Sequence, residues 1–173
     1  MWSCLTCPII RAYTCRGLGV LGSGAFLGMT ANVSSVTLPV ILQQREIGAR
    51  QRVELWSSVY DLTVRRWVPV GLLSAAAYFA AAVLAKPNAK YNTKGVLLAA
   101  GVSMASIVPA TAMLVAPVVR KLKGFLQGSP SDAEAKDTLK SWGVWHYSRT
   151  LGAGVAFLLG ITDLVMIAVN KGI

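Results

Sequence analysis

The sequence predicts an all-α fold, an integral membrane four-helix bundle, and the pattern of charges carries that prediction. Residues 17–44, 67–85 and 95–119 contain no Asp, Glu, Lys or Arg, and residues 147–170 contain only two charged side chains. An α-helix rises about 1.5 Å per residue, so roughly 20 residues cross the ~30 Å hydrocarbon core of a bilayer. Within lipid the backbone must bond to itself, which favours helices. We therefore expect one membrane domain over residues 1–173.

The first span is expected over residues 17–42, which are rich in small side chains. Gly24 and Gly28 have the small-xxx-small spacing that lets two helices approach closely in lipid. A charged segment, 45–66, follows. Within it the sequence predicts a short amphipathic helix between spans 1 and 2, at residues 53–65, because apolar and aromatic side chains recur there at helical spacing. That stripe consists of Val53, Trp56, Tyr60 and Thr63.

The remaining spans are expected at residues 67–85, 95–118 and 146–169. Pro109 and Pro117 lie in or at the end of the third span. A proline lacks the backbone N–H that a helix interior needs, so a kink or a widened turn is expected there.

Basic residues outnumber acidic ones by 17 to 7, giving a net charge of +10. In a soluble protein this excess would suggest nucleic acid as a partner. Here the basic residues lie almost entirely between the spans, where they meet anionic lipid headgroups. The expected partner is therefore the lipid bilayer and not nucleic acid. The pattern indicates a multi-pass membrane protein, with the endoplasmic reticulum or another endomembrane favoured. The oligomeric state stays open, a homo-oligomer included.

No metal or cofactor motif is recognisable. Cys4, Cys7 and Cys15 precede the first span, and the single histidine, His146, lies far from them, so four zinc ligands do not come together in the sequence. The segment Gly17-Leu-Gly19-Val-Leu-Gly22 matches a dinucleotide fingerprint, but it lacks both a preceding strand and the acidic residue about 20 positions later. We expect no metal and no cofactor.

Polar and small residues on the fourth span recur at alternating steps of four and three, which places them on one helical seam. They are Trp142, His146, Arg149, Ala153, Ala156, Gly160 and Asp163. Arg149 and Asp163 are fourteen residues apart, about 21 Å along one helix, so they cannot pair with each other. Asp163 is expected to form an ion pair near the opposite surface with one of Arg16, Lys86, Lys90 or Lys94.

His146 and Arg149 are the candidate catalytic residues, because imidazole can accept a proton and guanidinium can stabilise a developing oxyanion. A pocket lined by them and by aromatic side chains would suit a planar, partly anionic molecule. The candidate substrate contacts are Trp142, Trp56, Tyr60, Thr111 and Asn32. The alternative interpretation is an aromatic belt with a snorkelling arginine at the membrane surface.

Two segments resemble the anthrone-oxygenase-like family of small four-span membrane proteins, which includes enzymes of fungal polyketide pathways. The first comprises Pro109, Thr111, Pro117 and Leu122, and the second comprises Leu139, Trp142, His146 and Arg149. Trp56 and Tyr60 after the first span are similar too. The chain departs from the family at Val118 and Val119, where many members carry asparagine.

The resemblance implies oxidation of an anthrone-type polyketide by O₂ to an anthraquinone, without a cofactor. In that reaction His146 would act as the base and Arg149 would hold the enolate oxygen, with Trp142 and Trp56 stacking on the rings. Two other functions stay open: a non-enzymatic membrane scaffold or assembly protein, and a small-molecule carrier.

Overall fold

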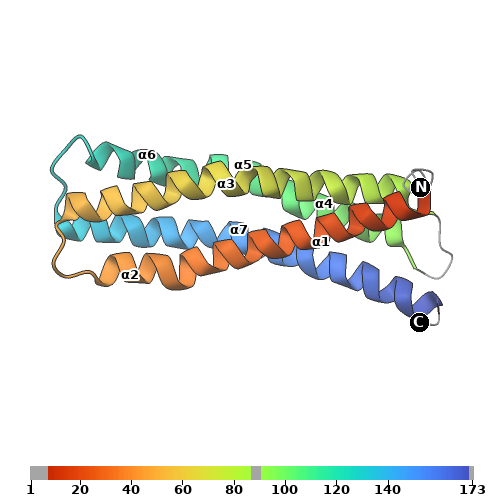
Figure 1. Ribbon diagram of the computed structural model, residues 1–173. Coiled ribbons are helices and arrows are strands. Elements are labelled where there is room, and N and C mark those ends of the chain that lie inside the picture. Colours follow the sequence, from red (N-terminus) through yellow and green to blue (C-terminus); the bar gives the residue numbers. More distant parts are fainter. Residues whose placement is uncertain (1–7, 87–90, 172–173) are drawn as a thin grey trace, which may run out of the picture. The chain divides into compact units, whose positions relative to one another are not determined.

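The computed structural model describes residues 8–86 and 91–171, and all regular structure in these ranges is helical (Figure 1). In chain order the elements are α1 Pro8–Asn32, the π-helical turn η1 Val33–Thr37, α2 Leu38–Gln43, α3 Ala49–Leu84, α4 Thr93–Ala105, α5 Ile107–Ala110, the π-helical turn η2 Thr111–Val115, α6 Ala116–Phe125 and α7 Asp132–Lys171. Cys4 and Cys7 lie outside the described residues.

These elements form four continuous helical segments, each long and apolar enough to cross a membrane. The predicted fold class is thereby confirmed, and the chain is a multi-pass membrane protein. The segments contain 34, 36, 33 and 39 residues, which corresponds to about 50–60 Å each. Because a hydrocarbon core is only ~30 Å thick, part of each segment extends beyond it.

Residues 53–65 are helical, as the amphipathic stripe predicted, but they are not separated from the second span. They form the first part of α3, which runs for 36 residues without interruption. Pro69 lies inside α3 and removes only one hydrogen-bond donor from the helix, so the helix continues past it. The aromatic residues of the stripe therefore lie on the same helix as the second span.

Each of the two π-helical turns ends two residues before a proline. η1 precedes Pro39, and η2 lies between Pro109 and Pro117. A proline cannot donate to the carbonyl four residues earlier, and a one-residue widening of the helix accommodates that missing bond. The widened turn expected in the third span is confirmed, whereas η1 was not anticipated from Pro39.

The packing divides the chain into two compact units, which we describe separately. Unit 1 comprises residues 1–27, 69–106 and 152–173, and unit 2 comprises residues 28–68 and 107–151. The single membrane domain expected from the sequence stays a prediction.

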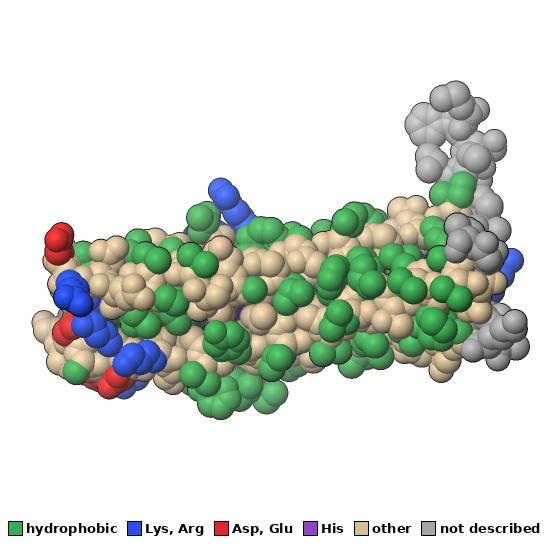
Figure 2. Space-filling view, turned by 90° about the horizontal axis from the view of Figure 1, so that it is seen from below, with side chains coloured by type: hydrophobic (Ala, Val, Ile, Leu, Met, Phe, Trp, Pro, Cys, Tyr) green, Lys and Arg blue, Asp and Glu red, His purple; other side chains and the backbone are tan. Residues whose placement is uncertain are grey.

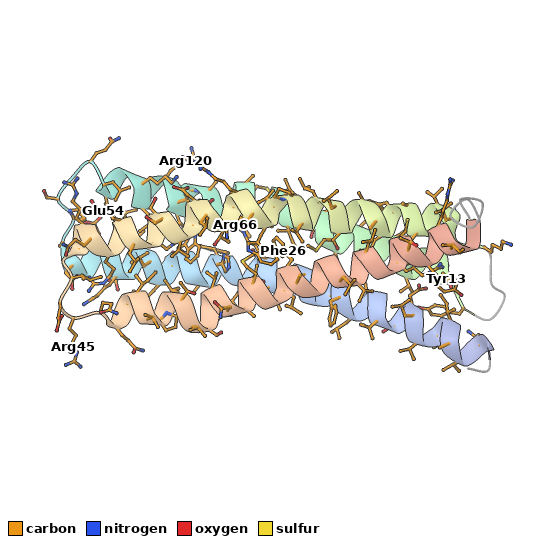
Figure 3. The ribbon with its side chains drawn as sticks, in the orientation of Figure 1. Tyr13, Phe26, Arg45, Glu54, Arg66 and Arg120 are labelled. Carbon is orange, nitrogen blue, oxygen red and sulfur yellow. The ribbon has the colours of Figure 1, made fainter. Side chains whose placement is uncertain are left out.

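On the face shown in Figure 2, side chains of both charges cluster in one region, further Lys or Arg side chains project elsewhere, and hydrophobic side chains are visible over much of the remaining surface. Among the residues of unit 2 labelled in Figure 3, Arg45 lies just beyond α2, Glu54 lies in the first turns of α3, and Arg120 projects from α6. Unit 2 thus carries charged groups of both signs on its surface, as expected for helix ends that leave the hydrocarbon core.

In unit 1 the helices approach closely at glycines. A Cβ atom at Gly19 would lie 2.8 Å from the Tyr78 ring, and one at Gly24 would lie 2.9 Å from Phe157. Gly28, the other half of the predicted small-residue pair, has nothing within 4 Å of that position. Gly24 therefore meets the expectation of close packing, and Gly28 does not.

The interior of unit 1 is polar as well as close-packed. The Tyr78 hydroxyl donates to the carbonyl of Ala156 at 3.0 Å and shares a hydrogen bond with Ser23 at 2.9 Å. Asp163 Oδ2 accepts from Arg16 Nε at 2.8 Å, so one of the four partners expected from the sequence is confirmed. Both side chains are buried, so the pair is internal to the unit rather than exposed at a membrane surface.

In unit 2 a hydrophobic cluster surrounds Trp56 and Trp142. A buried arginine, Arg52, connects the end of α2 and the loop after it to the start of α7. Arg52 is 1% exposed and donates to the backbone carbonyls of Ile41, Gln44 and Ile47. It also forms an ion pair with Asp132, at the start of α7. Because one guanidinium serves three carbonyls and a carboxylate, it fixes the end of α2 and the following loop against α3 and α7.

We expect Gly160→Ala to destabilise unit 1, whereas Gly17→Ala should not. A Cβ atom at Gly160 would collide with the Tyr78 hydroxyl and Val20, but at Gly17 nothing lies within 4 Å. Overpacking typically costs about 1–3 kcal/mol, whereas alanine is intrinsically better than glycine within a helix. Thermal unfolding in detergent, followed by helical circular dichroism, measures the difference. Equal melting temperatures for the two variants would contradict the close contact.

Arg52→Ala should lower the free energy of unfolding by about 2–3 kcal/mol, because buried acceptors then lose their donor. Arg50→Ala is the matched control: it lies two residues away, pairs only with Glu54 and is 66% exposed. Such exposed pairs contribute less than about 1 kcal/mol. Denaturant unfolding of both variants in micelles tests the ranking, and a loss at Arg50 as large as that at Arg52 would show it to be wrong.

Candidate active site

Unit 2 contains a pocket formed by three helical segments: the η1–α2 stretch, the first half of α3, and α7. Its lining comprises Val33, Thr37, Leu38, Ile41, Trp56, Val59, Tyr60, Thr63, Trp142, His146 and Arg149. His146 and Arg149, the candidate catalytic residues, therefore line the same pocket, together with three of the candidate substrate contacts. One turn of α7 brings the two there, because residues three apart lie on one helical face.

The pocket is narrow as it stands. About 300 Å³ of space lies between its atoms, part of it open to the outside, but the centre of a water-sized sphere can reach only about 10 Å³. That is about the minimum for one water molecule. A tricyclic ligand would need the half-buried side chains to move, and these are Thr37, Val59, Tyr60 and Thr63.

Four aromatic rings form a continuous cluster along the pocket. Trp142 stacks on His146 with ring centroids 4.7 Å apart and planes inclined by 28°. Trp56 stacks on Tyr60 at 5.3 Å and meets Trp142 edge-on at 5.4 Å. Since each ring is held by a neighbour, the imidazole has a fixed plane, and one of its faces is already covered.

The nitrogen atoms of this cluster lack hydrogen-bond partners. Four nitrogen atoms have no partner within hydrogen-bonding geometry among the described residues: both imidazole nitrogens of His146 and the indole nitrogens of Trp56 and Trp142. All three side chains are no more than 2% exposed. The backbone of Thr30 lies close to the imidazole without satisfying that geometry. Buried polar atoms are nearly always paired, so these four atoms call for a water molecule or a ligand.

Arg149 is buried without a carboxylate beside it. Its Nε donates to the Thr111 hydroxyl at 3.0 Å, and the Tyr60 hydroxyl lies next to the guanidinium. Thr111 is the first residue of η2, so the widened turn in the third span supplies the residue that orients Arg149.

All seven acidic residues of the chain lie in the described ranges, and none pairs with Arg149. Six of them pair with other cations: Glu54, Asp61, Asp132, Glu134, Asp137 and Asp163. The seventh, Glu46, makes no ion pair with a described residue. Burying a cation without a counter-charge is unfavourable by several kcal/mol, so an anionic or strongly polar ligand would find a prepared partner here.

Two of the candidate substrate contacts are placed differently. Thr111 holds Arg149 rather than lining the pocket itself. Asn32 is exposed, and its side-chain oxygen accepts from Thr37 at 3.3 Å, outside the pocket lining.

Sequence reasoning missed the apolar wall of the pocket, which consists of Val33, Leu38, Ile41 and Val59. A usable signal was present in Pro39, because a proline inside a charge-free span indicates a local distortion of that helix. The described ranges contain no group of three potential metal-ligating side chains, and the absence of a cofactor stays a prediction.

One comparison with known proteins identifies a family. Residues 56–159 match the family model described as anthrone oxygenase, and these residues include Trp56, Tyr60, Thr111 and the α7 seam from Trp142 to Ala156. No curated protein and no solved structure gives a significant match. Because the matched segment covers more than half of the chain, the protein belongs to the anthrone oxygenase family.

Proposed function

We propose that this protein is a cofactor-independent oxygenase that oxidises an anthrone-type polyketide to an anthraquinone with O₂. The observation that carries the proposal is the pairing of a buried guanidinium, free of any described carboxylate, with an imidazole whose nitrogens are both unpaired, in one aromatic pocket. A ligand that loses a proton and becomes an anion satisfies both groups. Family membership supports an oxygenase of this class.

The chemistry begins at the methylene group of the anthrone, whose protons are acidic because the anion is delocalised into the ring carbonyl. His146 accepts one of these protons as general base. Negative charge develops on the carbonyl oxygen, which Arg149 holds by a charge-assisted hydrogen bond. The neighbours of Arg149, Thr111 and Tyr60, fix the guanidinium in place before the charge appears.

The oxidation can proceed on the substrate itself. The electron-rich carbanion transfers one electron to O₂, and the resulting substrate radical and superoxide combine into a carbon-bound peroxide. Loss of the second C–H proton and cleavage of the O–O bond release hydroxide and leave a carbonyl group. The net reaction converts the methylene and O₂ into a carbonyl and water, so all four electrons that reduce O₂ come from the substrate.

The lining of the pocket supports an aromatic, largely apolar substrate. Its wall is aliphatic along η1 and α2, and the half-buried Tyr60 and Thr63 lie on α3 at its edge. Entry of a tricyclic molecule requires these side chains to rotate, because the closed pocket has room for only one water molecule. O₂ fits without such a change.

His146→Gln should lower kcat for anthrone oxidation about 10²- to 10⁴-fold, the usual contribution of a general base. Purified protein is incubated with anthrone in detergent under air, and quinone absorbance is followed over the non-enzymatic background. Tyr147→Phe is the control, since Tyr147 is the next residue on α7 and is 50% exposed. Parental turnover by a folded His146→Gln protein would exclude His146 as the base. A preparation that never oxidises anthrone but elutes with a stable protein partner would favour the scaffold function.

Arg149→Met should lower kcat about 10²- to 10³-fold with a smaller change in KM, because the guanidinium acts mainly on charge that develops in the transition state. Arg149→Lys should recover part of that loss, since it retains the charge but cannot reach both neighbours with the same geometry. Steady-state kinetics of the two variants in one detergent test this order. Arg149→Met and Arg149→Lys variants with equal kcat would contradict the proposed role of the positive charge.

A further inference from the structure

The two buried tryptophans of unit 2 have an unmet hydrogen-bonding requirement. Trp56 and Trp142 are 1% and 2% exposed, and both line the pocket. Each indole nitrogen carries a hydrogen that can only be donated, and neither finds an acceptor among the described residues. A buried donor left unpaired costs about 1–3 kcal/mol, so two in one pocket are a substantial sacrifice of stability.

No described residue supplies an acceptor to either indole nitrogen. Most backbone carbonyls in the surrounding helices accept from N–H groups of their own helix. The acidic side chains of the chain pair with other cations, apart from Glu46 in the loop after α2. Trp145, only three residues from Trp142, is 42% exposed and can meet water or lipid headgroups. The unmet requirement therefore belongs to the tryptophans of the pocket.

A neighbouring aromatic ring already covers one face of each of these tryptophans. Trp142 lies against His146, and Trp56 lies against Tyr60, in stacked arrangements. The sequence-based expectation was that both indoles stack on a ligand. A neighbour covers one face of each ring, and the N–H is the polar group of each indole that has no hydrogen-bond partner among the described residues.

We propose that the indole N–H groups of Trp56 and Trp142 donate hydrogen bonds to oxygen atoms of the ligand and so select oxygenated polycyclic molecules over bare hydrocarbons. This inference rests on the proposed function for the identity of the ligand. The pocket then offers the ligand several donors: two indoles, the guanidinium and one imidazole nitrogen, beside the hydroxyl groups of Thr37, Tyr60 and Thr63, which can donate or accept. Such a set recognises a planar molecule with several acceptor oxygens on its edge and gives little to one without them.

The test is equilibrium binding to the full-length purified protein in detergent, without turnover. The probes are 1,8-dihydroxyanthraquinone, which has oxygen atoms on both sides of its central ring, and anthracene, which has the same three rings and no oxygen. Trp142→Phe and Trp56→Phe remove the N–H while keeping an aromatic ring. Trp145→Phe is the matched control on α7. Ligand absorbance after dialysis reports binding, so the loss of a tryptophan does not disturb the readout.

The affinity of 1,8-dihydroxyanthraquinone should fall about tenfold in each pocket variant, as expected for the loss of one hydrogen bond to a buried donor. Anthracene should change by less than about threefold in the same proteins, and Trp145→Phe should leave both probes unchanged. Equal losses for the two probes would mean that the indoles only fill space, and unchanged affinity for both would mean that they do not touch the ligand. Binding of neither probe by the parental protein would also overturn the inference.

The two proposals fail separately. His146→Gln should lower anthrone turnover about 10²- to 10⁴-fold but keep the preference for the oxygenated probe, because the base is not one of the two indoles. If anthrone is never oxidised and the tryptophan variants still lose that preference, the proposed reaction is wrong and the indole assignment stands. If anthrone is oxidised and both tryptophan variants keep the preference for the oxygenated probe, the proposed reaction stands and the indole assignment is wrong.

Discussion

A positive charge buried without a counter-charge is the constraint on which the candidate site depends. Arg149 has Thr111 and Tyr60 beside it but no described carboxylate, in a chain whose acidic residues are nearly all committed to other cations. Such a group is unfavourable by several kcal/mol unless a polar or anionic molecule joins it. In the same pocket both nitrogens of His146 and the indole nitrogens of Trp56 and Trp142 have no partner among the described residues. A ligand with an ionisable oxygen would accept from the guanidinium and the indoles.

Three arginines are buried among the residues that the structure describes, and Arg149 differs from the other two in its interaction partners. Arg16 pairs with Asp163 inside unit 1, and Arg52 serves three carbonyls and Asp132 at the polar end of unit 2. Both have their charge compensated, so structural support is a sufficient explanation for them. The third, Arg149, has no described carboxylate beside it and lines a pocket together with an imidazole and two unpaired indoles. The three arginines are equally buried, since all are at most 6% exposed. They differ in whether a carboxylate pairs with the guanidinium.

The two π-helical turns place residues at the site: one turn contributes to the pocket wall, and the other carries the hydroxyl that contacts Arg149. η1 contributes Val33 and Thr37 to the pocket wall, and η2 begins with Thr111, the hydroxyl that holds Arg149. Both turns precede prolines, whose missing N–H makes the wider turn acceptable at that point. The prolines thus affect the site through the backbone, because they lie next to the turns that carry Val33, Thr37 and Thr111.

Charge-free runs of about 20 residues determined the four spanning helices, because lipid leaves the backbone few alternatives. Periodicity along one helix likewise placed His146 and Arg149 on a common face, since three residues make nearly one turn. The rest needed tertiary structure. Asn32 lies outside the pocket, Thr111 acts through Arg149, and η1 forms a wall, because these outcomes depend on how separate helices pack. No local pattern records which donors remain unpaired after packing, and in this protein those donors define the site.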